Sequence, residues 1–360
     1  MAKQTIPLID ADVHHAWRSD EDLIERLREP YKSEVAQYGQ RQLKSGIRFE
    51  EGGMRWDTKP PGGGGAGSDP DHMKEQLLDR YGIRCAFLSG QTGPIAGIPD
   101  PDYAAAMCAA FNNLTVEKWL PHDVRFVSGI HVPLQDPQLA VREIERLAGH
   151  PQMVAVQFFA TANRIPFGQR YYWPIYEACE RVGLPIHVHP STTAVIANAA
   201  SGPAGMVTTY LESHTILPTF YMAQVASLIF EGVFEKFPQL KIGLMEGGFT
   251  WAPHLLWRMD KEFKGLRQQA PYLKRLPSAY VREHVRFGTQ PIEEPDKAEH
   301  LVQIMDMLGE DALMWTSDYP HWDFDEPTAI PHCLNETARR KILHDNAAMF
   351  FNLPLAVEVN

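Results

Sequence analysis

Ile9-Asp10-Ala11-Asp12-Val13-His14 and Ile186-His187-Val188-His189 are the most informative stretches of the sequence. Each is an apolar, strand-like run that ends in side chains able to bind a metal ion. Glu246 and Asp318 end two further apolar runs far along the chain. Ionisable groups are costly inside a protein unless they are paired or bound to a metal. If the four strand ends meet, as they do in a closed parallel barrel, they form the cluster that a divalent-metal enzyme needs.

Short apolar runs recur along the chain, and amphipathic helical patterns stand between them. The runs are Ile6–Val13, Ile83–Ser89, Arg125–Val132, Met153–Phe159, Leu184–His189, Leu240–Glu246, His284–Thr289 and Ala312–Ser317. This alternation predicts an α/β fold, a single (β/α)8 TIM barrel that occupies residues 1–360 as one domain. A doubly wound open sheet is the alternative, although no GxGxxG follows any of the strands.

A long insertion interrupts the alternation after the first strand, from about residue 16 to about residue 75. It contains Pro60-Pro61-Gly62-Gly63-Gly64-Gly65, and a glycine run of this kind is flexible. The insertion leaves the carboxyl end of the first strand, which is the mouth of the predicted barrel. We therefore expect a loop region that can act as a lid. A surface excursion without a role in the site is the alternative.

The composition is typical of a globular protein, with 44% apolar and 22% charged residues. A formal net charge of −11 argues against nucleic acid and anionic membrane surfaces as partners. The four cysteines form no CxxC pair, no signal-peptide pattern opens the chain, and no apolar run reaches ~18 residues. We expect a cytoplasmic protein that binds a small molecule and forms a homodimer or assembles with a related subunit.

Imidazole and carboxylate donors at the strand ends suit zinc, manganese or iron. The predicted metal ligands are Asp12, His14, His189, Glu246 and Asp318. Zinc is the expected ion, with one position left for water, which a metal makes acidic enough to supply hydroxide near neutral pH. Iron or manganese, as one ion or as a pair, is the alternative, because an extra carboxylate could bridge two ions.

Three of the strand-end residues are predicted to take part in catalysis: Asp318, Glu246 and His187. Asp318 could bind metal, move a proton or do both, and Glu246 could be a further ligand or a general base. His187 shares a face with His189 because side chains alternate along a strand. A core histidine bonded to the backbone is the alternative for His187. By the same alternation, Asp10 lies one layer below Asp12.

Candidate substrate contacts lie on the predicted mouth-side loops: His321, Trp251 and Trp17. Aromatic walls suit a flat organic substrate. Packing of long loops is the alternative for the two indoles. His214 is expected to be an ordinary polar residue. A serine triad is poorly supported because the chain has no GxSxG, and the glycine run lacks the GK[ST] ending of a phosphate-binding loop.

These stretches resemble the amidohydrolase superfamily, in its amidohydrolase-related (amidohydrolase 2) branch. Ile9–His14 is similar to the first-strand HxH motif, with Asp12 in place of the first histidine. Gly183–Pro190 is similar to the strand-five motif, which implies that His189 is a ligand. Ser317-Asp318-Tyr319-Pro320-His321 resembles the strand-eight motif that carries a metal-bound aspartate. The resemblance covers nearly the whole chain and implies a metal-dependent hydrolase or decarboxylase.

The chain departs from the family pattern at two positions. Many decarboxylating relatives carry a catalytic histidine where Glu246 stands, which argues against decarboxylation. Dinuclear relatives often use a carbamylated lysine on strand four, and Met153–Phe159 contains no lysine. A few carboxylate-rich members of this fold act as non-haem dimetal oxygenases.

The leading prediction is a metal-dependent hydrolase that attacks an amide, an ester-like group or an activated C–C bond of a small organic substrate with metal-bound water. A non-haem dimetal (Fe/Mn) oxygenase is the first alternative. A metal-dependent decarboxylase of an aromatic acid is the second. A structural or partner subunit with a vestigial site is the non-enzyme alternative.

Overall fold

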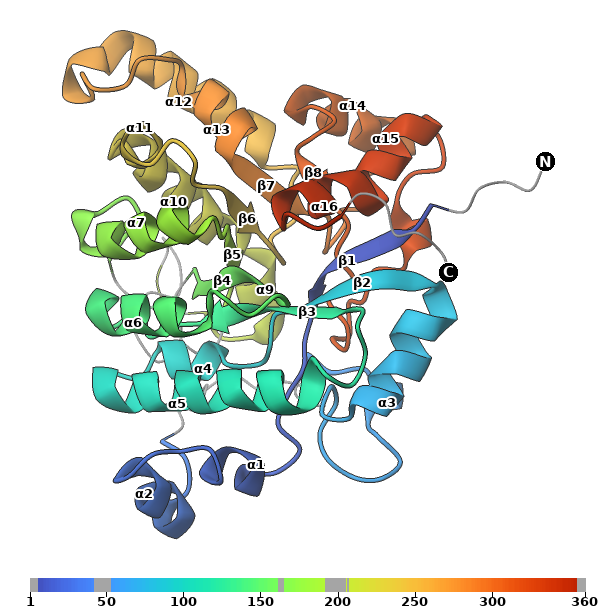
Figure 1. Cartoon of the computed structure of the whole chain (residues 1–360). Coiled ribbons are helices and arrows are strands. Elements are labelled where there is room, and N and C mark those ends of the chain that lie inside the picture. The colour runs from blue at the N-terminus through green and yellow to red at the C-terminus, as the bar shows by residue number, and fades with distance from the viewer. Residues whose placement is uncertain (1–5, 42–52, 161–164, 192–204, 206, 355–360) are drawn as a thin grey trace.

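A computed structural model describes residues 6–41, 53–160, 165–191, 205 and 207–354 (Figure 1). Its strands form one eight-stranded parallel sheet in which each strand pairs with the next along the chain. The strands are β1 (Leu8–Val13), β2 (Ile83–Leu88), β3 (Phe126–His131), β4 (Met153–Phe159), β5 (Ile186–His189), β6 (Ile242–Leu244), β7 (Val285–Gly288) and β8 (Leu313–Met314). The predicted α/β TIM-barrel fold is confirmed.

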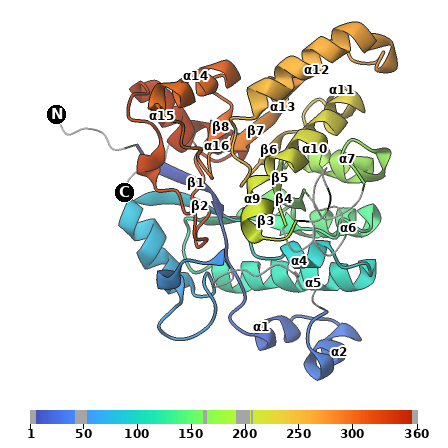
Figure 2. The ribbon, with the colours of Figure 1, turned by 180° about the vertical axis from the view of Figure 1, so that it is seen from behind.

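Helices surround the strands on the outside of the barrel, as the two opposite views show (Figures 1 and 2). The α-helices are α1 (Asp20–Ile24), α2 (Tyr31–Tyr38), α3 (Pro70–Met73), α4 (Gly93–Ala96), α5 (Pro101–Leu114), α6 (Pro137–Leu147), α7 (Trp173–Val182), α9 (Tyr210–Thr215), α10 (Pro218–Phe230), α11 (Val233–Lys236), α12 (Ala252–Leu266), α13 (Pro277–His284), α14 (Ala298–Leu308), α15 (Glu336–Arg340) and α16 (Asn346–Phe350). Short 3₁₀ and π segments are η2 (Trp56–Thr58), η3 (Lys74–Asp79), η4 (Thr115–Trp119), η5 (Arg170–Tyr172), η6 (Arg267–Gln269), η7 (Pro327–Ala329) and η8 (Lys341–Asp345).

Three of these helices begin at an Asp-Pro pair in the sequence. The side chains of Asp69, Asp100 and Asp136 each accept backbone N–H groups from the first turn of α3, α5 and α6. Proline in the first turn costs no hydrogen bond there, because those N–H groups have no intrahelical acceptor. Gly183 ends α7 in a left-handed conformation with φ 73°, which fits its predicted place between helix and strand.

The last strand returns to the first through backbone hydrogen bonds. The N–H of Ala11 donates to the carbonyl oxygen of Trp315 at 3.1 Å, and the N–H of Asp318 donates to that of Asp12 at 3.1 Å. The N–H of His14 donates to the carbonyl oxygen of Tyr319 at 2.7 Å. These contacts draw the ends of β1 and β8 together although they are some three hundred residues apart in sequence.

An apolar cluster fills the base of the barrel below the strand ends. It takes Ile9, Phe87, Val127 and Val154 from β1 to β4 and Met314 from β8, and it adds residues of α16. The rings of Phe87 and Phe351 stack with their centroids 4.6 Å apart. A larger cluster lies between the strands and the surrounding helices. The base is therefore filled by side chains, and polar groups gather at the opposite, carboxyl end.

The insertion after β1 contacts the mouth of the barrel. The N–H of Trp322 donates to the carbonyl oxygen of Gly53 at 2.9 Å, and the N–H of Arg55 donates to that of Pro320 at 3.0 Å. Met54 and His321 pair as an antiparallel bridge. Residues 42–52 lie outside the described residues, and closure of the insertion as a lid stays a prediction. In the part of the chain that the structure covers, no helix is long and apolar enough to cross a membrane.

Candidate metal centre

Four of the predicted ligands meet at the mouth of the barrel. Asp12 and His14 come from the end of β1, His189 from the end of β5, and Asp318 from the segment after β8. All four are buried, and each offers a nitrogen or oxygen atom within 4.8 Å of those of the others. The fifth predicted ligand, Glu246, follows β6, and its Oε2 lies 2.8 Å from Nε2 of His189. The barrel thus brings the predicted ligands together.

Backbone carbonyl groups fix the rings of the two histidines. Nδ1 of His14 lies 2.9 Å from the carbonyl oxygen of Gly90, and Nδ1 of His189 lies 2.7 Å from that of Pro190. Only an N–H can bond a carbonyl oxygen, so Nδ1 is the protonated nitrogen and Nε2 faces the cluster. This is the usual arrangement behind a metal-binding histidine.

The Nε2 atoms then point at carboxylate oxygens. Nε2 of His14 lies 2.8 Å from Oδ1 of Asp318, and Nε2 of His189 lies 2.8 Å from Oε2 of Glu246. If the imidazoles were neutral, the lone pair of each Nε2 would face a lone pair of a carboxylate oxygen, and the two would repel each other. A positive charge must therefore sit among them, either as a metal ion or as protons on the rings. Burial alone would lower the pKa of His189, but Asp12 and Glu246 raise that pKa to about 10.

Unpartnered oxygens favour a metal ion over protons. Both carboxylate oxygens of Asp12 and Oδ2 of Asp318 are buried and lack a hydrogen-bond partner among the described residues. Such atoms cost free energy unless something in the centre binds them. The ion-pair partners of Asp12 and Asp318 within the described ranges are histidines, not lysine or arginine. Nitrogen and oxygen donors arranged in this way fit a divalent cation.

The backbone is strained at two of the carboxylates. Glu246 has φ 51° and Asp318 has φ 59°, in the left-handed region that costs non-glycine residues about 1–3 kcal/mol. The hydroxyl of Tyr221 holds the first of these turns by donating to the carbonyl oxygen of Met245. Strain of this kind persists only where the surrounding structure imposes it, so the fold holds both carboxylates in the centre.

Asp10 is a buried carboxylate next to the ligand cluster. The pairing of β1 with β2 is irregular between Asp10 and Val13. Oδ1 of Asp10 accepts the backbone N–H groups of Asp12 at 3.2 Å and Ser317 at 3.0 Å. Asp10 therefore fastens β1 to the segment after β8, next to two metal-facing aspartates. Burial raises the pKa of Asp10 to about 8.

Three of the predicted catalytic and substrate residues lie outside both the ligand cluster and the pocket lining. Nε2 of His187 bonds the carbonyl oxygen of Ala11 at 3.0 Å and the ring stacks on Phe87, which matches the core-histidine alternative. Trp251 donates from Nε1 to Gly247, and Trp17 packs edge-on against Phe111. None of the three is among the described residues that line the pocket. Their positions do not support the predicted catalytic and substrate-binding roles.

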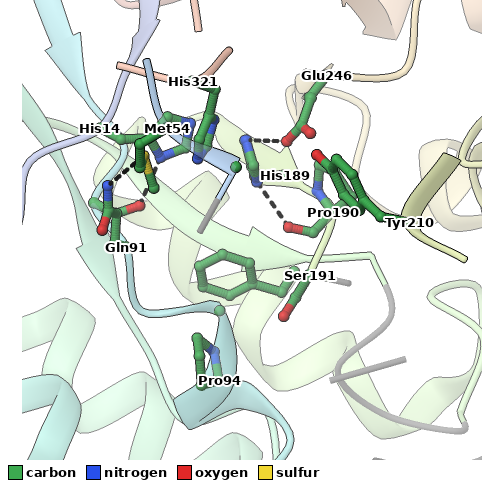
Figure 3. Close-up of a pocket in the computed structure, with 14 residues that line it drawn as sticks. His14, Met54, Gln91, Pro94, His189, Pro190, Ser191, Tyr210, Glu246 and His321 are labelled. Atoms are coloured by element: carbon green, nitrogen blue, oxygen red, sulfur yellow. Dashed lines mark hydrogen bonds and ion pairs between the residues drawn. The ribbon is translucent and has the colours of Figure 1, made fainter. Parts of the chain in front are cut away.

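The centre opens on a cavity of about 220 Å³ (Figure 3). His14, His189, His321 and Glu246 gather at one end, and Ser191 lies at the other. The cavity is lined by His14, Gly53, Met54, Gly90, Gln91, Gly93, Pro94, Phe159, His189, Pro190, Ser191, Tyr210, Glu246 and His321. His321, a predicted substrate contact, faces the cavity. Met54 comes from the insertion after β1 and Tyr210 from the start of α9, which follows β5, and no sequence pattern indicates that either lines the site.

A second group of polar side chains lies beside Glu246. Nε2 of His214, on α9, lies 3.4 Å from Oε1 of Glu246 and 3.3 Å from Oδ2 of Asp323. Nδ1 of His321 lies 2.7 Å from Oδ1 of Asp318. His214 is therefore part of the centre and not the ordinary polar residue that we expected. Its sequence offered no periodicity or motif that would have placed it there.

A buried histidine near the centre leads to a pH-dependent prediction. Burial, with His14 adding to the effect, lowers the pKa of His131 from 6.5 to about 3. The unfolded chain gains a proton below pH 6.5 and the folded chain does not, so this group makes stability fall as the pH drops. Nδ1 of His131 lies 2.6 Å from Oγ1 of Thr92, a contact that an asparagine amide can imitate.

In His131→Asn this contribution disappears. Between pH 7.5 and pH 5.5 the variant should lose about 1.4 kcal/mol less unfolding free energy than the wild type. Urea unfolding at both pH values, with a chelator present to remove metal effects, measures the difference. His254→Asn, at an exposed position, is the control and should follow the wild type. Equal losses in all three proteins would contradict the prediction.

Comparison with known proteins places the chain among enzymes of related sequence. A family model described as Amidohydrolase matches residues 9–353. A gamma-resorcylate decarboxylase from a Polaromonas species is 26% identical over 305 residues, which cover 79% of this chain and 88% of that protein. A 2-amino-3-carboxymuconate-6-semialdehyde decarboxylase from Dictyostelium discoideum is 22% identical over 293 residues, which cover 79% and 77%.

Solved structures share the fold. The 5-carboxyvanillate decarboxylase from Novosphingobium aromaticivorans, complexed with manganese and 4-hydroxy-3-methoxy-5-nitrobenzoic acid, superposes with a TM-score of 0.73 at 19% identity, covering 98% of each chain. The 5-carboxyvanillate decarboxylase from Sphingomonas paucimobilis gives 0.70 at 22% identity, covering 97% of this chain and 100% of that one. These similarities overturn the prediction of a hydrolase, because the similar proteins are decarboxylases, the reaction given second among the alternatives.

Proposed function

The chain belongs to the amidohydrolase family, and from this membership we propose that it is a metal-dependent, non-oxidative decarboxylase of a small aromatic acid. The observation that carries the proposal is the buried set of Asp12, His14, His189 and Asp318, which holds unpartnered carboxylate oxygens and of which His14 and His189 line a small cavity. The similarity to decarboxylases over most of the chain supports the reaction class. Glu246, in place of the histidine expected for such enzymes, is the main departure.

We propose manganese as the ion, instead of the zinc expected from the sequence. Two of the four donors are carboxylates, and hard oxygen donors favour manganese over zinc. Solved structures of similar decarboxylases contain manganese. When bound, the cation would polarise the carboxylate and a neighbouring hydroxyl oxygen of the substrate and stabilise negative charge on them.

The cavity walls suit a single aromatic ring. Met54, Pro94, Phe159 and Pro190 give apolar surfaces on which a flat ring can lie. Among the described residues that line the cavity there is no lysine or arginine. A substrate carboxylate would therefore meet its positive charge at the metal end of the cavity. Its ring would then extend toward Ser191 and Pro94.

The proposed reaction exchanges a carboxylate for a hydrogen atom. The bond between the ring carbon and the carboxylate breaks, carbon dioxide leaves, and a new C–H bond forms with a proton from the protein. Among the described residues that line the cavity, the titratable groups other than the proposed ligands His14 and His189 are Glu246, His321 and Tyr210. We propose that one of these three delivers the proton. The reaction needs no oxidant, no reductant and no attacking water.

Isotope labelling tests the proposed function. Manganese-loaded protein is incubated in D₂O with a panel of hydroxybenzoic acids, and products are followed by NMR and carbon dioxide by mass spectrometry. We expect stoichiometric carbon dioxide and deuterium at the carbon that carried the carboxylate. Hydroxybenzoate methyl esters are the matched controls, since they cannot release carbon dioxide directly. Absence of turnover across the panel, or a requirement for oxygen, would refute decarboxylation.

Removing the metal should destabilise the protein as well as inactivate it. Without a cation, the buried carboxylates of Asp12 and Asp318 lose their counter-charge. A ligand present at 100 times its Kd contributes about 2.7 kcal/mol. For a protein of this size that corresponds to a rise in Tm of roughly 4 °C. Calorimetry of chelated protein, and of the same sample reloaded with Mn²⁺, measures the shift. An unchanged Tm would mean that no cation binds to the folded state.

A further inference from the structure

We propose that the pocket binds a second divalent cation through Glu246, Asp318 and His321, with Asp318 shared between the two ions. This deepens the proposed function and rests on it for the first ion. Each of the three residues offers a ligand atom within 4.8 Å of those of the other two. Glu246 and His321 also line the cavity beside His14 and His189 (Figure 3). The first and second sets therefore adjoin at Asp318.

Asp318 has the geometry of a shared ligand. Its Oδ1 lies 2.8 Å from Nε2 of His14, a first-site ligand, and 2.7 Å from Nδ1 of His321, a second-site ligand. Its Oδ2 is fully buried and has no hydrogen-bond partner within the described part of the chain. The rings of His14 and His321 lie with their centroids 4.5 Å apart. One carboxylate thus stands between two histidines, and each histidine comes from a different ligand set.

His214 and Asp323 lie behind Glu246. Nε2 of His214 lies 3.4 Å from Oε1 of Glu246 and has no hydrogen-bond partner among the residues that the structure covers. Oδ2 of Asp323 lies 3.3 Å from Nε2 of His214 and accepts from Nε2 of Gln290 at 2.8 Å. One imidazole therefore faces two carboxylates and cannot balance the charge of both. A cation bound by Glu246 would supply the remaining positive charge.

The charge of the centre matches two divalent ions. Asp12 and Asp318 are fully buried, and the side chains of Glu246 and Asp323 are 9% and 10% exposed. Across the described ranges, all the ion-pair partners of these four carboxylates are histidines. When all four are ionised, one divalent ion balances two of the four negative charges, and isolated buried charges cost several kcal/mol each. A second ion would balance the rest and would favour the ionised form of Asp323, whose pKa burial raises to about 7.

Occupation of this second site narrows the proton source. Glu246 and His321 would be ligands, which leaves Tyr210 as the titratable group that can still deliver a proton among the described residues lining the cavity. Its hydroxyl accepts from Nε1 of Trp322 at 3.3 Å. Burial raises the pKa of Tyr210, so its hydroxyl stays protonated at neutral pH. Tyr210→Phe should then lower kcat of decarboxylation without changing the number of ions bound.

Metal stoichiometry tests the second site directly. Protein saturated with Mn²⁺ and freed of excess ion is analysed by elemental analysis, and its EPR spectrum is recorded. We expect about two ions per chain and a spectrum broadened by coupling between neighbouring ions. Glu246→Gln, which keeps the shape and removes the charge, should bind about one ion and give the sharp spectrum of isolated Mn²⁺. His321→Asn should do the same.

A matched control uses another glutamate outside the centre. Oε1 of Glu293 accepts from the hydroxyl of Thr250 at 2.7 Å, and Glu293→Gln should keep both ions. One ion per chain in the wild type overturns the second site, and so does retention of two ions in both Glu246→Gln and His321→Asn. If one ion binds and decarboxylation is observed, the proposed function stands alone. If two ions bind and no acid in the panel reacts, the second site stands without it.

Discussion

Asp318→Asn is expected to abolish decarboxylation and to release the metal. Asp318 joins the ligand set on β1 to His321, and Oδ2 of its carboxylate is unpartnered. Asparagine has the same shape and tolerates a positive φ, so the strained turn at φ 59° should survive the substitution. What disappears is the negative charge on a metal ligand. A loss of several kcal/mol of transition-state stabilisation corresponds to a fall in kcat/KM of about 10³-fold or more.

The measurements are Mn²⁺ affinity by calorimetric titration and kcat/KM on whichever acid the panel identifies. Asp325→Asn is the matched control in the same loop, because Oδ2 of Asp325 accepts the N–H of Ile292 at 2.8 Å and does not face the centre. The control should retain wild-type affinity and at least about a third of the wild-type rate, since surface-loop changes of this kind cost little. An active, metal-loaded Asp318→Asn variant would show that this carboxylate is not a ligand.

Among glycine-to-alanine substitutions in the insertion, Gly67→Ala should destabilise the protein most. Gly67 has φ +72°, and an added Cβ would lie 2.4 Å from the carbonyl oxygen of His14. That oxygen is backbone and belongs to a metal-facing residue. The carbonyl oxygen of Gly67 also accepts the N–H of Ala16 at 2.9 Å, so neither segment can move away freely. Backbone strain and overpacking together should cost about 3 kcal/mol.

Gly39→Ala separates strain from collision. Gly39 has φ +76°, nearly the same φ as Gly67, and an added Cβ would meet nothing within 4 Å. Its substitution should cost about 1–2 kcal/mol, from backbone strain without collision. Urea unfolding measures both variants, and Mn²⁺ titration should show affinity reduced by roughly tenfold in Gly67→Ala alone, because His14 shifts. Equal destabilisation in the two variants would show that the insertion does not press on the strand end.

The contacts of the insertion distinguish the two expectations for it, a region of the site and a surface excursion. Gly53, Met54 and Arg55 contact the segment after β8, and Met54 lines the cavity. The insertion is therefore part of the wall of the site and not only a surface excursion. Closure of the insertion over a bound substrate stays a prediction.

The sequence by itself determined the barrel and most of its metal-facing residues. Apolar residues recur with different periods in strands and in helices, and Asp-Pro pairs and glycines stand at the ends of these elements. The alternation of strands and helices could therefore be recognised from the sequence alone. Parallel strands of a barrel all end on one face, which is why Asp12, His14, His189, Glu246 and Asp318 could be placed together in advance. Those arguments need only local patterns and one topological rule.

Tertiary structure alone decided which polar groups face the centre. Asp10 accepts the N–H of Ser317, which is 307 residues away in sequence, and no local pattern indicates that contact. Met54, Tyr210 and His214 come from segments whose course no local pattern fixes, because long loops take their conformation from what they pack against. Ligand orientation also depends on carbonyl groups such as that of Gly90, seventy-six residues from His14 in sequence. Local periodicity therefore specifies strands and their ends, and long-range contacts specify which side chains meet there.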